Sequence, residues 1–358
     1  MPDFSIGVDL GGTNLRVAAI SGDGQLLEKI TLDTKVVLGR DHVIREMCDA
    51  IQLLSGKHKA AGKFLGPGIG IPGLIDMQAG VVRKAANLPG WENYPVRAEI
   101  ERRLGTRAPA EGVVIENDAR VAALGEQWLG AARGVANMAV LTLGTGIGGG
   151  IVLGGRIWHG MNGMAGEFGH VTLEPDGRPC GCGNRGCAEQ YASASAIVRM
   201  AREAIANGEA PSLAQAASSD TEFGAKSIYN LAMLGDEHAR GIFRSFGRAL
   251  GLLLAGLVNV LNLEMFVIGG GVSSAWDAFA PDMFQELRQR SVVYTATAPT
   301  GTLGRDSFGQ EESASAQAES RRERKTIITR ALLGSDAGLY GAARLPLLQD
   351  EDKSRLPG

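Results

Sequence analysis

Three of the four cysteines in this sequence lie within eight positions, at Cys180, Cys182 and Cys187. The residues between them include three glycines, so a regular helix is not expected there. A disulfide framework would spread its cysteines along the chain, whereas thiols clustered on one loop are typical of a metal site. The spacing therefore predicts a metal-binding loop.

A closed metal site needs a fourth ligand. His170, ten residues upstream of the first clustered cysteine, is the nearest candidate, and His159 is the second. Three thiolates and one imidazole suit Zn²⁺, although Cys-x-Cys is tighter than the usual spacing. Four protein ligands leave no open position, so we expect a structural zinc that fixes the loop carrying Glu167 and Glu189. The alternative is a set of free thiols.

Two glycine turns follow apolar, strand-like stretches. Asp9, Gly11, Gly12 and Thr13 belong to the first turn, and residues 144–150 (Gly-Thr-Gly-Ile-Gly-Gly-Gly) form the second. Glycine lets backbone N–H groups approach a phosphate closely, and the carboxylate of Asp9 is suited to holding Mg²⁺ through water. Each turn is equally compatible with an ordinary tight β-hairpin.

The second turn also matches the dinucleotide-binding pattern Gly-x-Gly-x-x-Gly. That pattern requires a helix directly after the turn, whereas residues 151–153 (Ile-Val-Leu) are typical of a strand. A P-loop sequence of the type Gly-x-x-x-x-Gly-Lys-Ser/Thr is absent from the chain. Neither a Rossmann site nor a P-loop is therefore expected.

Asn117 and Asp118 stand where a predicted strand, residues 113–116, gives way to a predicted helix, residues 119–129. Phosphoryl transfer to a sugar hydroxyl needs a carboxylate that accepts the hydroxyl proton, and a helix N-terminus favours the charged form that such a base requires. Asn and Asp are also the preferred helix caps, so the pair is open to both interpretations. Asn87 and Asn93, on a loop with Pro and Gly, are possible sugar contacts or turn caps.

The elements that must position these residues repeat a pattern. A strand, a glycine turn and a second strand open both halves of the chain, which suggests two duplicated domains. Strands then alternate with helix-length segments, which is typical of an α/β protein. The strands predicted in this way are residues 5–10, 15–20, 26–30, 139–143, 151–153 and 156–159, and a further strand leads into a glycine turn within residues 265–273.

Length and composition agree with a two-domain globular protein. The chain has 358 residues, a net charge of −3, 44% hydrophobic and 21% charged residues. This charge gives no broad basic field for nucleic acid or acidic membranes. The longest apolar run, residues 249–258, is closed by Asn259 and Asn262 and is too short to span a bilayer, so it is expected to be a buried helix. No signal peptide is expected, so the predicted location is the cytoplasm.

The motifs together resemble the ROK family (repressors, open reading frames and sugar kinases), and within it the bacterial glucokinases. The Gly-His pair followed by Cys-x-Cys-Gly-x-x-Gly-Cys is the most specific part of the resemblance. It covers nearly the whole chain, through motifs that begin at Asp9, Ile71, Asn87, Glu116, Leu143, Gly166, Cys180 and Ile268.

The resemblance implies an actin-like ATPase fold (hexokinase-type, ribonuclease H-like) with two α/β domains around a central cleft. The small domain is expected at residues 1–118, with a closing helix at residues 336–348 packing back on it. The large domain is expected at residues 119–335, with the zinc loop at 170–187 and a polar insertion at about 300–325. The stretch of residues 293–325, which contains this insertion, is longer and more polar than expected for the family.

The resemblance also implies roles for the candidate residues. Asp118 is the implied general base, which takes the proton from the sugar 6-hydroxyl. The implied sugar-binding residues are Asn87, Asn117, Asp118, Glu167, His170 and Glu189, and His170 is also an implied zinc ligand with Cys180, Cys182 and Cys187. The implied contacts to ATP and Mg²⁺ are Asp9, Gly11, Gly12, Thr13, Thr145, Gly146, Gly270 and Gly271. A homo-oligomer, often a dimer, is usual in the family.

The expected activity is ATP-dependent phosphorylation of a hexose at its 6-hydroxyl, with glucose as the first candidate. Mannose, fructose and N-acetylhexosamines are alternatives, because a few hydrogen bonds around the sugar 2-position decide between them. Polyphosphate is an alternative donor. A non-catalytic sugar-sensing regulator is disfavoured by Asp118 and by both glycine turns. The DNA-binding segment that repressors of the family carry before the first strand is not expected here either.

Overall fold

The computed structural model describes residues 3–85, 88–105, 112–299 and 324–355, which group into two compact units. Unit 1 consists of residues 1–136, 150–166 and 332–358, and unit 2 of residues 137–149 and 167–331. Unit 1 therefore takes in residues 119–136 and 150–166, which lie beyond the boundary predicted at residue 118.

Unit 1 is built on a five-stranded sheet with the order β3-β2-β1-β4-β7. The first three strands form an antiparallel meander, and the last two continue the sheet parallel to β1. Their bounds are β1 (Phe4–Leu10), β2 (Asn14–Ser21), β3 (Leu26–Asp33), β4 (Phe64–Ile71) and β7 (Val114–Asn117). The four strands predicted within this sheet are confirmed, with ends that differ by up to three residues.

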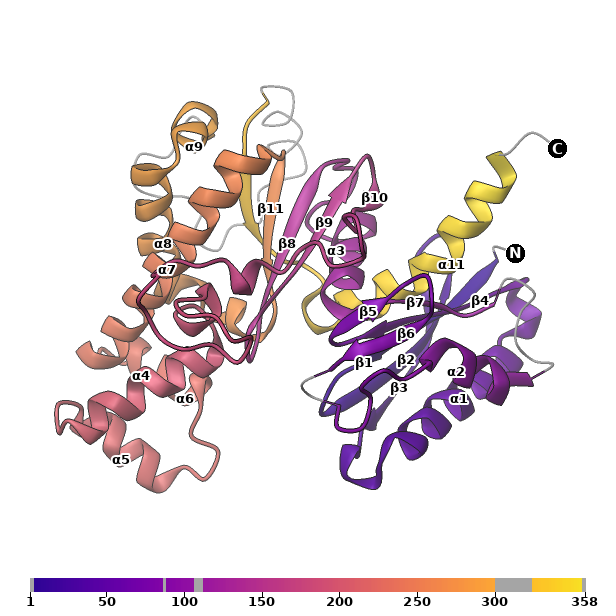
Figure 1. The fold of residues 1–358 in the computed structure, drawn as a ribbon, viewed down its shortest axis with the longest axis horizontal. Coiled ribbons are helices and arrows are strands. Elements are labelled where there is room, and N and C mark those ends of the chain that lie inside the picture. Colours follow the sequence, from indigo (N-terminus) through magenta and orange to yellow (C-terminus); the bar gives the residue numbers. More distant parts are fainter. Residues whose placement is uncertain (1–2, 86–87, 106–111, 300–323, 356–358) are drawn as a thin grey trace. The chain divides into compact units, whose positions relative to one another are not determined.

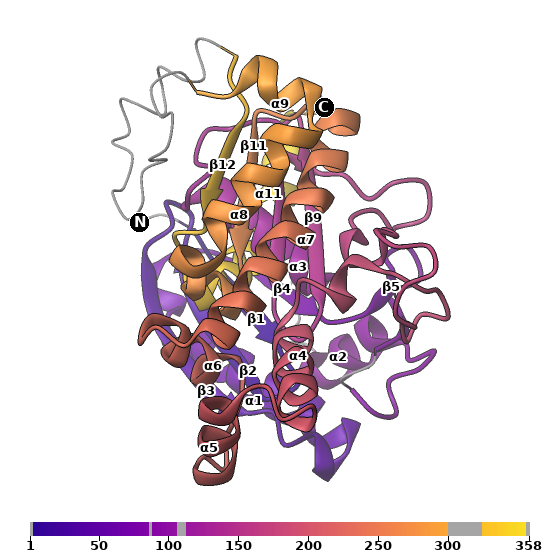
Figure 2. The same ribbon diagram turned by 90° about the vertical axis from the view of Figure 1, so that its left-hand side faces the viewer.

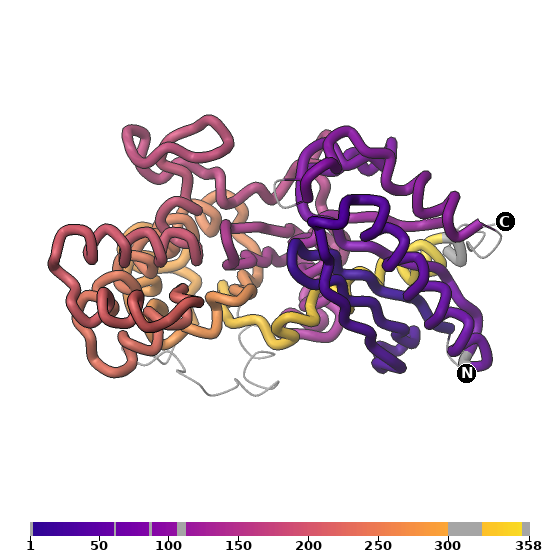
Figure 3. Tube along the Cα trace, turned by 90° about the horizontal axis from the view of Figure 1, so that it is seen from below, coloured from indigo at the N-terminus to yellow at the C-terminus, as the bar shows by residue number. Residues whose placement is uncertain are grey.

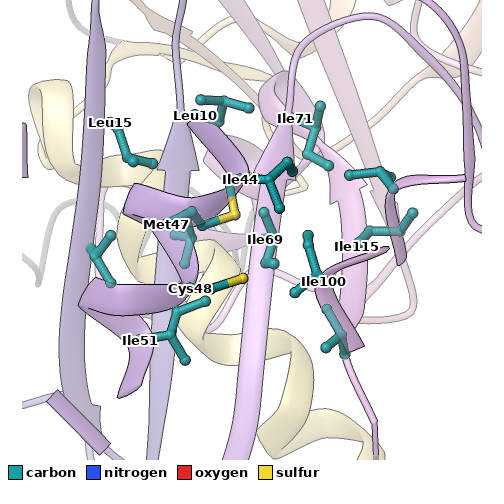
Figure 4. Packing of buried hydrophobic residues seen from close by; sticks show 14 of the residues in the cluster. Leu10, Leu15, Ile44, Met47, Cys48, Ile51, Ile69, Ile71, Ile100 and Ile115 are labelled. Carbon is teal, nitrogen blue, oxygen red and sulfur yellow. The ribbon is translucent and has the colours of Figure 1, made fainter. Parts of the chain in front are cut away.

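Helices cover both faces of this sheet. The helices α1 (Arg40–Lys57) and α2 (Val96–Leu104) lie on one face, and α11 (Ala337–Arg355) lies on the other (Figure 1). The core between the sheet and the first two helices contains aliphatic side chains from every layer (Figure 4). Examples are Leu10, Leu15, Ile69, Ile71 and Ile115 from the strands and Ile44, Met47, Ile51 and Ile100 from the helices.

Glycines in the two central strands allow α11 to pack directly on the sheet backbone. A Cβ atom on Gly7 would lie 2.2 Å from the oxygen of Leu339, and one on Gly68 would lie 1.9 Å from the oxygen of Ala342. Ser5, on the same face of β1, donates from Oγ to the oxygen of Ala343 at 2.6 Å. The C-terminal helix therefore returns to the N-terminal strands, as the trace in Figure 3 shows.

The remaining elements of unit 1 are short. A two-stranded hairpin of β5 (Leu74–Asp76) and β6 (Val81–Lys84) follows β4, and α3 (Asp118–Trp128) follows β7 without a loop. α3 packs closely against α11. The strand β10 (Arg156–Ile157) also groups with this unit.

The second sheet has the order β10-β9-β8-β11-β12. Its longer strands are β8 (Met138–Leu143), β9 (Ile147–Leu153), β11 (Met265–Gly269) and β12 (Ile327–Arg330), and β8 and β12 are both parallel to β11. The boundary between the units falls inside β9, between residues 149 and 150. The predicted turn at residues 144–150 is too long, because β9 already begins at Ile147. The strand β9, and not a helix, follows the turn, so the dinucleotide-binding pattern lacks the helix that a Rossmann site requires.

The described part of unit 2 also contains six α-helices and the irregular segment of residues 171–193. The helices are α4 (Ala194–Ala206), α5 (Pro211–Ser219), α6 (Ala225–Met233), α7 (Glu237–Leu261), α8 (Trp276–Arg290) and α9 (Val292–Thr297). The two longest, α7 and α8, lie side by side (Figure 2) and share a cluster of aromatic rings from Phe243, Phe246 and Phe279.

Helix α7 is the one described helix long and apolar enough to cross a membrane, and 61% of its most apolar window is buried. It packs against α8, α6 and α4, as a core helix does. Asn262 ends it in the left-handed conformation, with φ of 43°, as predicted. Asn259 ends the apolar run but not the helix, which continues to Leu261, and Asn259 Oδ1 accepts a hydrogen bond from Ser291 Oγ at 2.7 Å. Nearly all of the polar insertion predicted at about 300–325 lies outside the described residues.

Candidate active site

Asp118 is the first residue of α3 and comes directly after the end of β7. Its Oδ1 accepts a hydrogen bond from the N–H of Ala119 at 2.9 Å. The carboxylate therefore lies at a helix N-terminus, where exposed N–H groups stabilise negative charge. Strands β1, β4 and β7 are parallel, so this junction lies at the edge of the sheet where their carboxyl ends meet, the usual location of ligands in α/β proteins.

Asn117, and not Asp118, is the capping residue. Its Oδ1 accepts from the N–H groups of Ala119 at 3.0 Å and Arg120 at 3.3 Å. Its Nδ2 donates to the oxygen of Gly73 at 3.0 Å, which joins the cap to the loop after β4. Asn117 therefore satisfies the helix cap by itself. The carboxylate of Asp118 shares one of the donors that Asn117 caps, the N–H of Ala119.

Asp9 stands near the end of β1 at the same edge of the sheet. Arg16 Nη1 donates to Asp9 Oδ2 at 3.1 Å, and the first turn of α11 packs beside the carboxylate at Gly338. Burial raises the pKa of Asp9 above its ordinary value, and Arg16 opposes that rise. Asp336 adds a smaller upward effect. An additional cation beside Asp9 would favour its charged form.

The first glycine turn is held by hydrogen bonds to Asn14, the first residue of β2, and from Thr34, the residue after β3. The N–H of Gly11 donates to the oxygen of Asn14 at 2.8 Å, and Thr34 Oγ1 donates to the oxygen of Gly11 at 2.7 Å. Thr34 N–H donates to the oxygen of Thr13 at 2.8 Å. Thr13 itself is exposed, and Gly12 is partly exposed. The turn is fixed while its outer surface remains open to a ligand.

In unit 2 the two remaining glycine elements meet at the carboxyl ends of β8 and β11. Gly270 has φ of 82°, and a Cβ there would lie 2.4 Å from the oxygen of Leu143. Only glycine allows this approach, so Gly270 has a packing role of its own. No atom lies within 4 Å of the Cβ position of Gly271, and Thr145 is exposed. These two residues thus offer accessible surface at one end of the sheet.

Glu189 lies against the second glycine turn. A Cβ on Gly146 would be 2.5 Å from Glu189 Oε2, while Glu189 Oε1 is 3.1 Å from Cys180 Sγ. Ser193, which caps α4, donates from Oγ to the oxygen of Glu189 at 2.7 Å. The carboxylate thus lies between the glycine turn and the cysteine cluster.

The predicted metal ligands are brought together. The ligand atoms of His170, Cys180, Cys182 and Cys187 all lie within 4.8 Å of one another. The Sγ atoms of Cys182 and Cys187 are 3.7 Å apart, and His170 Nδ1 is 3.7 Å from Cys180 Sγ. Two sulfurs in a tetrahedral zinc site lie about 3.8 Å apart, since each is about 2.3 Å from the metal. The donor set and its spacing fit Zn²⁺.

The pKa values of the three thiols in this cluster shift in different directions. Burial is the main cause for two of them. Burial raises the pKa of Cys180 to about 12 and also raises the pKa of Cys187, whereas the backbone N–H of Asn184 lowers the pKa of Cys182. Thiolates are the form that binds metal, and a bound cation stabilises them. His159, the second candidate for the fourth ligand, lies elsewhere, with its Nε2 at 2.5 Å from Glu116 Oε2.

The sugar-site predictions fall in both units. Asn117 and Asp118 belong to unit 1, whereas Glu167, His170 and Glu189 belong to unit 2. Glu167 is exposed and its oxygen accepts from the N–H of His170 at 3.1 Å, within the short helix Phe168–His170. Asn87 lies outside the described residues, and Asn93 is in the left-handed region with φ of 50°.

The sequence did not indicate the charged residues that contact Asp9 and the segment around Asn117. Arg16 contacts Asp9, and Glu116 contacts both Arg120 and His159. The signal available for Glu116 was its place in an otherwise apolar strand, since a buried carboxylate requires partners. The identity of those partners comes only from the fold.

The family model described as "ROK family" matches residues 5–315. The chain belongs to the ROK family. Among curated ROK relatives, the glucokinase of Halalkalibacterium halodurans is 39% identical over 306 residues, covering 84% of this chain and 91% of the relative. The glucokinase of Thermotoga maritima is 40% identical over 297 residues, covering 83% and 90%.

Solved structures of ROK proteins share the fold. A ROK family glucokinase from Streptomyces griseus, crystallised with glucose and AMPPNP, superposes with a TM-score of 0.73 at 32% identity, covering 96% of this chain and 98% of the other. This confirms the expected actin-like, hexokinase-type α/β fold. The family is functionally mixed: a xylose repressor from Caldicellulosiruptor bescii is 30% identical over 80% of this chain and 71% of its own length, and an N-acetylmannosamine kinase from Haemophilus influenzae is 29% identical over 84% and 91%.

Proposed function

We propose that this ROK protein is an ATP-dependent hexokinase that phosphorylates glucose at the 6-hydroxyl. The observation that carries the proposal is the separation of roles at the β7–α3 junction. Asn117 satisfies the helix cap, and Asp118 presents a carboxylate at the helix N-terminus. The similarity to curated glucokinases over most of both chains supports the activity and the choice of sugar.

Asp118 is the proposed general base. Phosphoryl transfer requires little covalent chemistry from the protein, so positioning and charge stabilisation dominate. As glucose attacks the γ-phosphate of ATP, the O–H bond of its 6-hydroxyl breaks, the proton passes to the Asp118 carboxylate, and ADP leaves. Asn117, Glu167, His170, Glu189 and Asn87 are the proposed hydrogen-bonding partners of the sugar.

The phosphates of ATP are proposed to contact the glycine turns. Gly11, Gly12 and Thr13 are accessible in unit 1, and Thr145, Gly146 and Gly271 are accessible or partly accessible in unit 2. Gly270 is proposed to contribute mainly by packing. Asp9 is the proposed Mg²⁺ partner, because it is the carboxylate nearest the first glycine turn in sequence. An added cation would also stabilise its charged form against the effect of burial. The metal would supply charge neutralisation at the phosphates.

The Cys/His cluster is proposed to hold one structural Zn²⁺. Its four donors fit a closed tetrahedral site and leave no open position for a reactant. Cys180 and Glu189 are in contact, so the metal would rigidify the loop that presents Glu189. We further propose a cytoplasmic homo-oligomer, a dimer in the simplest case. The net charge of −3 supports an enzyme without nucleic-acid or membrane partners.

The decisive experiment measures initial rates of ADP release with Mg-ATP and a panel of sugars. The panel contains glucose, mannose, fructose, N-acetylglucosamine and N-acetylmannosamine. The proposal expects the highest kcat/KM with glucose. A higher value with another sugar would keep the chemistry and overturn the substrate, and replacing ATP with polyphosphate tests the donor.

A sugar-responsive regulator is the second candidate, because a xylose repressor also matches much of the chain. It predicts sugar binding without turnover. Calorimetric titration with each sugar, run beside the kinetic panel, separates the two functions. Binding combined with no ADP release from folded, metal-loaded protein would support the regulator.

A further inference from the structure

Glu116 lies in β7 directly before the proposed catalytic pair, and its side chain is 2% exposed. A buried carboxylate needs partners, because an unpaired charge is costly to desolvate. Its Oε1 accepts from the N–H of Asn117 at 2.8 Å and from Arg120 Nη1 at 3.2 Å. Its Oε2 is 2.5 Å from His159 Nε2. A guanidinium thus holds one oxygen of the carboxylate, and an imidazole 43 positions away in the chain holds the other.

The two partners of Glu116 also hold the segment of residues 159–165 at both ends. Arg120, whose side chain is 4% exposed, donates to the oxygen of Ala165 from Nε at 3.2 Å and from Nη2 at 3.0 Å. The N–H of Ala165 donates in turn to the oxygen of His159 at 3.1 Å. The segment is thereby closed on itself and joined to the strand–helix junction through Glu116.

This arrangement connects the position of the imidazole to that of the proposed base. Glu116 accepts the N–H of Asn117, and Asn117 caps the helix whose first residue is Asp118. A rotation of the Glu116 carboxylate therefore moves a hydrogen bond of the residue next to the base. Displacements of about 1 Å in an active site can cost up to about 10²-fold in rate.

We propose that His159 is a positioning residue for phosphoryl transfer, acting through Glu116 and Arg120 on the backbone at Asn117 and Asp118. The inference rests on the proposed kinase function. His159 is 42% exposed whereas Glu116 is 2% exposed, so removing the imidazole leaves the core closed and takes one partner from a buried charge. Such a loss leaves the buried carboxylate with one partner fewer, so it can shift its remaining hydrogen bonds, including the one from the N–H of Asn117.

The first test compares two replacements of His159. His159→Ala is expected to lower kcat about 10-fold and to change the KM for Mg-ATP by less than about 2-fold, because alignment is lost and not binding. His159→Arg restores a hydrogen-bond donor beside Glu116 and is expected to return kcat to within about 3-fold of the wild type. An unchanged kcat in His159→Ala, or no recovery in His159→Arg, would overturn the proposal.

A matched control is available in the same unit. His58 Nε2 lies 2.9 Å from Glu28 Oε2, a second histidine–carboxylate pair whose carboxylate is 30% exposed. It joins the end of α1 to β3, the strand at the opposite end of the sheet order from β7. His58→Ala is expected to leave kcat within about 2-fold of the wild type. An equal loss of kcat in both alanine variants would mean that removing any histidine–carboxylate pair of unit 1 has this effect, and it would overturn the specific role of His159.

A second readout does not depend on turnover. Amide hydrogen exchange of residues 160–165 is expected to accelerate in His159→Ala and to remain at the wild-type rate in His58→Ala and His159→Arg. Wild-type protein that phosphorylates no sugar would refute the proposed function by itself. Unchanged exchange in His159→Ala would refute the anchoring role even in an active enzyme.

Discussion

Arg16 forms an ion pair with Asp9, with Nη1 of the guanidinium 3.1 Å from Oδ2 of the carboxylate. The pair is mostly buried, and the same Arg16 nitrogen also donates to the oxygen of Ser335 at 3.1 Å. Even with this partner, desolvation keeps the pKa of Asp9 above its ordinary value. The carboxylate is therefore held in a place that does not favour its charge, which is typical of groups kept for binding or catalysis.

The first prediction follows from the sign of this pKa shift. A carboxyl group whose pKa is raised in the folded state weakens folding when it is ionised, and this cost disappears as the pH falls through the raised value towards the unfolded value. Asp9→Asn is therefore expected to abolish activity and yet to raise the free energy of unfolding at pH 7. The gain should shrink at acidic pH, as measured by urea unfolding at several pH values.

Asp76 provides a control in which the pKa of the carboxyl group is lowered and not raised. Hydrogen bonds from the N–H of Ala79 and from Arg83 lower the pKa of its carboxyl group. Its charged form therefore stabilises the fold above the unfolded pKa, and this contribution is lost as the pH falls through the lowered value. Asp76→Asn should lose stability at pH 7, with a difference that vanishes in acid. The same pH trend in both variants would contradict the argument for Asp9.

The second prediction concerns the proposed base. Asp118→Asn keeps the size and hydrogen-bonding capacity of the side chain but cannot accept the hydroxyl proton. It is expected to lower kcat at least about 10²-fold, with little change in KM or melting temperature, since general-base catalysis contributes about 10²–10⁴-fold. Asp41→Asn makes the same change in the first turn of α1 and should leave kcat unchanged. A loss of less than about tenfold in Asp118→Asn would argue against a base at this position.

The third prediction tests the metal. Purified protein should contain about one zinc per chain, and Cys182→Ser should lower both the zinc content and the melting temperature, the latter by at least about 5 °C. Cys48→Ala removes the cysteine that lies in the core of unit 1 and should leave the zinc content intact. Chelation should reproduce the effect of Cys182→Ser. Full thermal stability of metal-free protein would rule out a structural role for zinc.

The fourth prediction concerns the contact between α11 and the sheet. Gly68→Ala places a methyl group where the oxygen of Ala342 lies 1.9 Å away, so the helix must move. The expected loss is at least about 3 kcal/mol in the free energy of unfolding. Gly56→Ala, in α1 with no atom within 4 Å of its Cβ position, should be neutral or gain up to about 1 kcal/mol. A loss below about 1 kcal/mol in Gly68→Ala would show that the helix adapts easily.

Local patterns made much of the fold predictable. The first hairpin, α7 and the β7–α3 junction follow from alternation, helical spacing and turn residues that act over a few positions. The metal cluster was predictable for the same reason, because its three cysteines share one short loop. The turn at residues 144–150 was predicted too long, since its last glycines belong to β9. A Cβ on Gly150 would lie 2.7 Å from Cβ of Ala123, so this glycine serves helix packing and not a turn.

The contacts that support the site could not be predicted in this way. The pair of Glu116 and His159 joins residues 43 positions apart, and the ion pair of Lys29 with Asp336 joins residues 307 positions apart. No periodicity in the sequence encodes such pairs, because they depend on how strands and helices are ordered in space. The sequence therefore offers His159 as a second candidate metal ligand, whereas in the fold its Nε2 contacts the carboxylate of Glu116.

The return of α11 to the N-terminal sheet has a consequence for biosynthesis. Ala18 and Ile20 of β2 are buried in a cluster with Leu339 and Ala343 of this helix. While the ribosome is still making unit 2, only α3 can cover part of this face of the first sheet, at β4 and β7, and apolar side chains of β2 stay in water. Unit 1 can mature only after residues 337–355 have been translated, so the nascent chain must carry an unfinished, aggregation-prone domain through most of its synthesis. Early stop codons should therefore produce chains that chaperones retain or proteases remove.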